Sequence, residues 1–290
     1  MPWCLKLATE SAIARYVVGT LAFVFAWKTL AASFGIVPDA STLSNRFLFA
    51  VYMICPVEPR YVGGAHVPSS ARSVVPALRE VALKQLALSL YASAAPGQLF
   101  AAPSGLAWAD SWVKTVLLYL FLSQQAALQA CALAALAGAQ PVEIFRDPLL
   151  RSRSPRDFWG ERWNLIVHGL LKRSVFAPSR RVAGTAVAAA ATFGASALFH
   201  VYVLCAACEP PWADMARMAG FFMAQFPLTF LEVALLRHFP WARRLPTPLC
   251  AAITTLAILP VAPLFLGPYE RGGMYTDMQR MQPTIVWVPA

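Results

Sequence analysis

The sequence predicts an all-α integral membrane protein with about six to eight transmembrane or half-spanning helices around an intramembrane cavity. Of its residues 58% are hydrophobic and 13% are charged, whereas a soluble domain carries about 25% charged residues. Four long runs contain no Asp, Glu, Lys or Arg, and these are 85–109, 115–142, 182–208 and 245–269. A bilayer core of ~30 Å requires about 20 apolar residues per helix. None of the runs alternates as a strand would.

The expected elements follow in chain order. The first apolar helix covers about 12–37, interrupted by Arg15 and Lys28, and several later spans favour a retained membrane helix over a cleaved signal peptide. The apolar stretch 47–55 is too short to span and is typical of a re-entrant or interfacial helix. Residues 56–76 form a polar loop rich in Pro, Gly and Ser.

The second half of the prediction consists mainly of spans. A helix is expected over about 75–95, and the run 85–109, broken by Pro96 and Gly97, is a weaker span. Stronger spans are expected at about 111–139, 182–208, 216–236 and 246–266. The tail from Gly267 is polar and expected outside the bilayer. With no internal repeat, the whole of 1–290 is interpreted as one membrane domain.

The net charge of +10 indicates how the loops are oriented. In a soluble protein such a charge would suggest nucleic acid. Here the basic residues lie between apolar runs, so we expect cytoplasmic loops that face anionic lipid headgroups and no nucleic-acid partner. The densest of these loops, 143–181, mixes Arg and Lys with aromatic residues and is predicted to be a cytoplasmic or interfacial segment. The six cysteines are scattered, and the Cys205-x-x-Cys208 pair has no second pair, so no metal site is expected.

His200 is the first candidate for chemistry. It lies about two-thirds along the uncharged run 182–208, and an ionisable residue at that depth indicates a functional site. The surrounding Gly, Ala, Ser and Thr residues allow close helix packing. Ser196, four residues earlier, lies on the same helix face. The alternative is a histidine that hydrogen-bonds a neighbouring helix as a purely structural contact.

A second candidate stretch precedes that helix. Ser154 and Asp157 are predicted caps, with Pro155 at the first helical position. Asn164 and His168 are four residues apart and are expected to share a face. An interfacial amphipathic helix with a tryptophan belt explains the same pattern without catalysis.

Three motifs in order give the chain a family resemblance. Residues 157–164 (DFWGERWN) are similar to the wax synthase signature, with Glu161 where Arg is usual. Residues 195–202 (ASALFHVY) and 223–228 (MAQFPL) are similar to stretches of diacylglycerol and sterol acyltransferases. The separation of Asn164 from His200 is close to that of the family. The chain therefore resembles the membrane-bound O-acyltransferase superfamily, in its wax synthase-like branch.

That resemblance implies an acyl-CoA-dependent O-acyltransferase of the endoplasmic reticulum membrane. The expected reaction is wax ester formation from a long-chain fatty alcohol, with diacylglycerol, a sterol or a terpenoid alcohol as alternative acceptors. It uses acyl-CoA as substrate and no further cofactor. His200 is the expected general base and Asn164 its catalytic partner. The candidate supporting residues are His168, Ser196, Gln225 and Glu232, and the candidate acyl-CoA contacts are Arg156, Arg162, Trp163, Lys172 and Arg173.

Two departures from the family keep other interpretations open. Val201 stands where Glu usually follows the family histidine, which leaves a non-catalytic membrane paralogue as an alternative. The chain is short for the family, so N-terminal spans are expected to be missing. A transporter also places ionisable residues in spans, although it usually has repeated halves. For Glu232, a role near His200 and a helix-end pair with Arg237 are both consistent with the spacing. The oligomeric state has no signal in the sequence.

Overall fold

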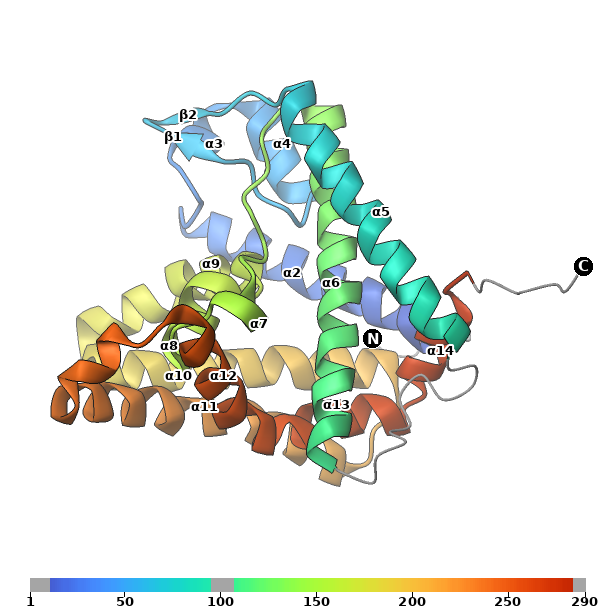
Figure 1. Cartoon of the computed structure of the whole chain (residues 1–290). Helices are drawn as coiled ribbons and strands as arrows, with labels where there is room; N and C mark the ends of the chain where they lie inside the picture. Colours follow the sequence, from blue (N-terminus) through green and yellow to red (C-terminus); the bar gives the residue numbers. More distant parts are fainter. Residues whose placement is uncertain (1–10, 95–106, 284–290) are drawn as a thin grey trace, which may run out of the picture.

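The computed structural model describes residues 11–94 and 107–283, and these are helical almost throughout (Figure 1). Within them the two-residue strands β1 (Tyr61–Val62) and β2 (Ala65–His66) form an antiparallel hairpin. Five stretches of the described chain are long and apolar enough to cross a membrane: Ala12–Ser33, Trp108–Ala137, Leu165–Ala207, Trp212–His238 and Thr247–Arg271. The predicted all-α, polytopic membrane fold is confirmed.

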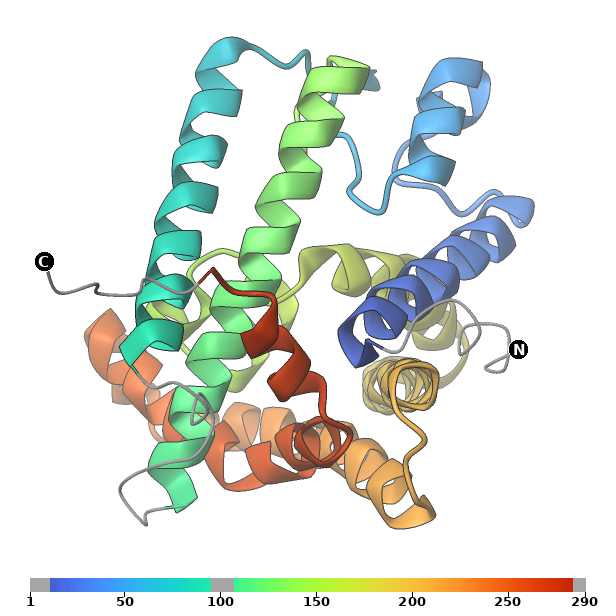
Figure 2. The same ribbon diagram turned by 90° about the vertical axis from the view of Figure 1, so that its right-hand side faces the viewer.

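The N-terminal half of the described chain contains three long helices and two short ones. Their bounds are α2 (Ala12–Ser33), α3 (Ser41–Ser44), α4 (Arg46–Ile54), α5 (Ala71–Ala94) and α6 (Ala107–Ala137). The helix α4 is the predicted short apolar helix, and it begins where the Asn45 side chain accepts hydrogen bonds from the next backbone N–H groups. The helix α5 begins inside the stretch expected to be loop and pairs lengthwise with α6 (Figure 2). Much of the weaker span 85–109 lies outside the described residues.

The hydrogen bonds of the buried Lys28 explain how the apolar helix α2 accommodates a cation. Its side chain has no exposed surface. The ammonium group donates to the carbonyl oxygens of Cys55 at 2.8 Å and of Tyr52 and Pro56 at 3.2 Å. A buried charge is tolerated only where its donors are satisfied. The cation of α2 therefore fixes the segment that follows α4.

The middle of the chain forms short helices that lead into a long hairpin. The short elements are α7 (Pro148–Arg151), α8 (Pro155–Asp157), the π-helix η1 (Phe158–Arg162), α9 (Leu165–Leu171) and the π-helix η2 (Lys172–Phe176). They continue into α10 (Ala177–Ala207), which bends at Gly184, where φ is +80°. The helix α11 (Trp212–His238) follows a short connection and packs along α10 (Figure 1).

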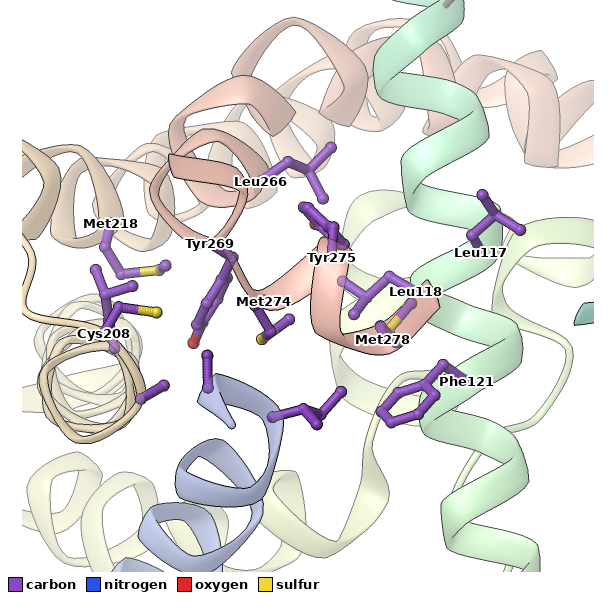
Figure 3. Close-up of a cluster of buried hydrophobic side chains, with 14 of the residues drawn as sticks. Leu117, Leu118, Phe121, Cys208, Met218, Leu266, Tyr269, Met274, Tyr275 and Met278 are labelled. Carbon is purple, nitrogen blue, oxygen red and sulfur yellow. The ribbon is translucent and has the colours of Figure 1, made fainter. Parts of the chain in front are cut away.

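The C-terminal part differs from the expected polar tail. It comprises η3 (Pro240–Arg244), α12 (Thr247–Ile258), η4 (Leu259–Val261), α13 (Ala262–Arg271) and α14 (Met274–Arg280). Met274, Tyr275 and Met278 of α14 are buried. Figure 3 shows them facing Leu117, Leu118 and Phe121 of α6 and Tyr269 of α13. Part of the tail therefore packs against the hydrophobic core through these apolar side chains. Its position outside the bilayer stays a prediction.

The helix α2 crosses α10 at very close range. A methyl group added at Gly19 would lie 2.7 Å from the Ala206 side chain, so only glycine permits this approach. Nearby, the Arg15 side chain donates to the carbonyl oxygen of Ala207 at 2.9 Å, and the backbone N–H of Ala12 donates to Asp277 at 2.6 Å. The crossing places α2 directly against the helix that carries His200.

Candidate active site

The His200 ring is held in one orientation by its own helix. Its Nδ1 atom lies 2.8 Å from the carbonyl oxygen of Ser196, one turn earlier in α10. A carbonyl oxygen only accepts hydrogen bonds, so Nδ1 carries the proton of the neutral ring. The lone pair is then on Nε2, which is the atom that can accept a proton from a substrate. Ser196, predicted as a supporting residue, makes this contact through its backbone and not through its hydroxyl group.

Aromatic side chains from three helices surround this imidazole. The ring of Phe222 in α11 stacks on it at a centroid distance of 4.1 Å and an interplanar angle of 26°. Phe199 lies edge-on at 4.6 Å, and Phe265 of α13 lies edge-on at 5.6 Å. The half-buried ring is therefore fixed both by a hydrogen bond and by packing, as a positioned general base must be.

The stretch 154–164 forms a compact, capped unit. The Ser154 side chain accepts a hydrogen bond from the N–H of Asp157 at 3.1 Å, and Pro155 is the first helical residue, so these predicted cap positions are confirmed. The carboxylate of Asp157 accepts from the backbone N–H of Arg153 at 2.8 Å and from the Arg162 side chain at 2.7 Å. These bonds shape the turn that presents Trp159 to α11.

Trp159 connects this unit to the surroundings of His200. Its indole N–H donates to the Gln225 side-chain oxygen at 3.1 Å, and the Gln225 amide donates to the carbonyl oxygen of Phe221 at 3.3 Å. Gln225 has no exposed surface. The Trp159 ring packs on Phe222 at 6.2 Å, and Phe222 in turn stacks on His200. Two residues, Trp159 and Phe222, therefore lie between the candidate supporting residue Gln225 and the imidazole.

Asn164 occupies the boundary between η1 and α9. It is the N-cap of α9 in a left-handed backbone conformation, with φ of +44°, and its side chain accepts from the N–H of Val167 at 3.5 Å. It therefore precedes the helix that carries His168. No direct contact joins Asn164 to His200 in the described part of the chain. Their connection runs through Trp163 and Trp159, whose rings are 6.3 Å apart. A shared cavity for the two residues stays a prediction.

The candidate acyl-CoA contacts divide into two groups. Arg162 is bound to Asp157, Arg173 forms an ion pair with Glu58 at 2.6 Å, and Trp163 stacks on Phe158 at 5.2 Å. Arg156 and Lys172 are exposed. Among these five residues, the exposed pair is therefore the part available for an anionic ligand without loss of an internal contact.

Glu232 has a different partner from either one expected. Its carboxylate accepts a hydrogen bond from the backbone N–H of Arg156 at 2.8 Å. This bond ties α11 to the start of α8. In the described contacts, Glu232 pairs with neither His200 nor Arg237, so its contribution to the site is to hold the 154–164 unit against α11.

A small apolar pocket lies beside α10, next to the residue preceding His200. Its lining comes from α2 (Phe23, Val24, Trp27), α9 (Val167, Leu170, Leu171) and α10 (Phe199). Its volume is about 10 Å³, which is room for about one water molecule. Sequence analysis missed this pocket and the packing of Phe222 on His200, because both depend on how separate helices pack together and not on local sequence. Trp159 could have been chosen from the sequence, because it lies within the DFWGERWN motif.

Comparison with known proteins identifies the class of the chain. Residues 142–224, which contain Trp159, Asn164 and His200, match the model of the membrane bound O-acyl transferase family. The chain is 28% identical over 164 residues to acyl-CoA–sterol O-acyltransferase 1 of Arabidopsis thaliana, covering 53% of this chain and 46% of that protein. It is 32% identical over 133 residues to the probable long-chain-alcohol O-fatty-acyltransferase 2 of the same plant, which covers 42% of this chain and 36% of that protein.

The five apolar candidate spans are those of a polytopic membrane protein. Over residues 142–224 the chain is similar to the membrane-bound O-acyltransferase superfamily, and its matched relatives are similar to the wax synthase-like branch. A further similar protein is the probable long-chain-alcohol O-fatty-acyltransferase 8 of Arabidopsis thaliana, at 29% identity over 159 residues, or 51% of this chain and 45% of that protein. The chain spans less than half the length of each of these three relatives.

Proposed function

We propose that this protein transfers a fatty acyl group from acyl-CoA to a long-chain fatty alcohol and so forms a wax ester. The observation that carries the proposal is the orientation of His200, whose Nδ1 is bound to the Ser196 carbonyl oxygen so that Nε2 is free to act as a base. The similarity to long-chain-alcohol O-fatty-acyltransferases supports the fatty alcohol as acceptor. An endoplasmic reticulum location is part of the same proposal.

The proposed reaction uses the imidazole twice. Nε2 of His200 accepts the hydroxyl proton while the alcohol oxygen attacks the thioester carbonyl carbon. The tetrahedral intermediate collapses as the carbon–sulfur bond breaks, and the same proton passes to the leaving sulfur of coenzyme A. Such general-base assistance contributes roughly 10²–10⁴ in rate. The Asn164 amide is the proposed donor to the developing oxyanion or to the acyl carbonyl. Arg156 and Lys172, both exposed, are the proposed contacts for the phosphates of coenzyme A.

A sterol is the second candidate acceptor. The specific observation in its favour is the similarity to acyl-CoA–sterol O-acyltransferase 1 over 53% of this chain. In this proposal, the shape of the acceptor site beside His200 determines which alcohol is used. A fatty alcohol requires a narrow channel, and a sterol requires a broad, flat one.

The test is an acceptor panel on membranes that contain the full chain. Radiolabelled acyl-CoA is supplied with a long-chain alcohol, a sterol or diacylglycerol, and the lipid products are separated. We expect a wax ester from the wild-type protein and a loss of about 10²–10⁴ in rate for His200→Ala and His200→Gln. His200→Gln retains an amide donor for the Ser196 carbonyl oxygen, so it separates base loss from packing loss.

His238 provides a matched control for this experiment. Its Nδ1 atom bonds the carbonyl oxygen of Ala234 at 3.0 Å, which is the same local geometry as at His200, but the residue is exposed at the end of α11. His238→Ala is expected to retain full activity. Wild-type membranes without ester product for any acceptor, or activity that survives His200→Gln, would refute the proposed function.

A further inference from the structure

The turn between α11 and α12 combines exposed aromatic and cationic side chains. We call residues 237–244 (RHFPWARR) the arginine turn. Phe239 is 49% exposed and Trp241 is 63% exposed. The side chains of Arg237, Arg243 and Arg244 are exposed as well. Large aromatic side chains rarely project into water without a partner, whereas they are enriched at the headgroup level of membranes.

No acidic side chain compensates the charge of the arginine turn. The sequence contains no Asp or Glu between Glu232 and Glu270. Within the described residues, none of the ion pairs includes an arginine of this turn. Glu232, the nearest carboxylate in the chain, is already bonded to the backbone of Arg156. The turn is therefore a concentrated positive surface without a counterion among residues 11–94 and 107–283.

A hydrogen-bonded clamp holds the arginine turn in place. The guanidinium group of Arg153 donates to the carbonyl oxygen of Arg243 at 2.9 Å, to that of Leu245 at 3.2 Å and to the hydroxyl of Thr247 at 3.0 Å. The guanidinium group of Arg153 is thus occupied by these hydrogen bonds, while the side chains of Arg243 and Arg244 remain exposed. The turn consequently presents its cations from a fixed backbone beside the 154–164 unit.

We propose that the arginine turn is a docking surface for anionic phospholipid headgroups. The guanidinium groups match phosphate and carboxylate oxygens in charge and geometry. Phe239 and Trp241 fit the boundary between headgroups and acyl chains, which a free phosphate does not offer. The turn also directly follows α11, a candidate membrane span, which places it at that boundary. A lipid surface, and not a soluble anion, is therefore the occupant.

The test measures binding of soluble short-chain lipids to the purified full chain in nonionic detergent. Dihexanoyl phosphatidylserine is titrated against dihexanoyl phosphatidylcholine, with coenzyme A and pyrophosphate as separate arms. We expect wild-type protein to prefer phosphatidylserine. The triple variant Arg237→Gln/Arg243→Gln/Arg244→Gln is expected to bind it roughly a hundredfold more weakly, at roughly fivefold for each arginine.

A triple variant with the same loss of charge is the control. Arg46, Arg60 and Arg79 are exposed on other elements, α4, the segment before β1 and α5, and their replacement by Gln is expected to leave the preference unchanged. Trp241→Ala should weaken binding of both lipids and preserve their ratio. Equal binding of the two lipids by the wild type, or an unchanged preference in the arginine-turn variant, would overturn the proposal. So would pyrophosphate or coenzyme A that competes with phosphatidylserine at equal affinity, since the occupant would then be a free phosphate.

Discussion

The buried side-chain oxygen of Gln225 accepts a hydrogen bond from the indole N–H of Trp159 at 3.1 Å across 66 positions of sequence. This bond joins the DFWGERWN motif to α11 one turn after Phe222, the residue that stacks on His200. Two motifs that are separate in the chain therefore meet in one contact. The Trp159 ring also contacts Phe222, so we expect this bond to help position the Phe222 ring and, through it, the imidazole.

The Trp159–Gln225 bond is expected to show strong non-additivity. Trp159→Phe leaves the buried oxygen of Gln225 without its donor, and such a group costs about 1–3 kcal/mol. Gln225→Leu leaves the indole N–H without its acceptor, at a similar cost. In the double variant neither group remains, so its loss of stability should be clearly smaller than the sum of the two. Thermal unfolding in detergent measures all three variants, and additive losses would show that the bond is not formed.

Ser196→Ala is expected to be nearly silent. His200 contacts the carbonyl oxygen of residue 196, which alanine also supplies in a helix. The rate of ester formation should remain within about twofold of the wild type, because the substitution removes no cap, core contact or buried hydrogen bond of the His200 ring. The assay is the initial rate in membranes at matched protein level. A large loss would instead assign the hydroxyl group a role with the substrate.

Two substitutions at Asn164 separate backbone strain from chemistry. Asn164 has φ of +44°, so alanine would be strained there at a cost of order 1–3 kcal/mol. Glycine accepts this conformation and replaces a cap at a cost of only a few tenths. Asn164→Gly should therefore fold well yet lose about 10²–10³ in rate if the amide stabilises the oxyanion. A fully active Asn164→Gly protein would restrict Asn164 to a capping role.

Val201→Glu is expected to lower stability without raising activity. Val201 is partly buried and packs against the main apolar cluster. Figure 3 shows several residues of that cluster. A carboxylate at this position would be placed in an apolar cluster, and burying a charge costs free energy unless it is paired. Val201→Thr, which adds one hydroxyl group, serves as the milder control. Melting temperature and ester formation are measured together, and a gain in activity would show that the family glutamate has a partner in this chain.

The spans could be predicted from the sequence because each is a local, mostly apolar run with few charged residues. The cap at Ser154 and Pro155 was equally local and was predicted correctly. The packing of α14 was missed, because its buried residues Met274, Tyr275 and Met278 lie in a short polar segment and are buried by helices that are distant in the chain. The hydrogen bonds of Lys28 were missed for the same reason, since its three carbonyl partners lie at the end of α4 and just after it.

For the candidate site, too, local features could be predicted from the sequence and contacts between helices could not. The depth of His200 in an uncharged run marked it as a candidate, and the resemblance of 157–164 to a family motif marked Asn164. Neither signal predicts which side chains surround the imidazole. The roles of Gln225 and Glu232 depend on how α11 meets the 154–164 unit, and that arrangement is a property of the assembled helices.

The bonds from Arg153 to the carbonyl oxygens of Arg243 and Leu245 also constrain topology. Two loops that touch outside the bilayer lie on one side of it, so the chain between them crosses an even number of times. The spans that end at Ala207 and His238 supply these two crossings. At the opposite ends of the helices, Asp214 pairs with Arg271 at 2.6 Å, which marks the other side.

The same count of membrane crossings, even or odd, bears on the role of α5. The N–H of Ala12 bonds Asp277, and Lys114 pairs with Glu270 at 2.7 Å, so α2 and α6 both begin on the side of Arg271. Since α2 carries the chain to the opposite side, an odd number of crossings must return it before Lys114. The 24-residue helix α5 is long enough to do so, and we expect it to cross, although it is not one of the five apolar candidate spans. Such a crossing would place the β-hairpin, the 154–164 unit and the arginine turn on one face of the membrane.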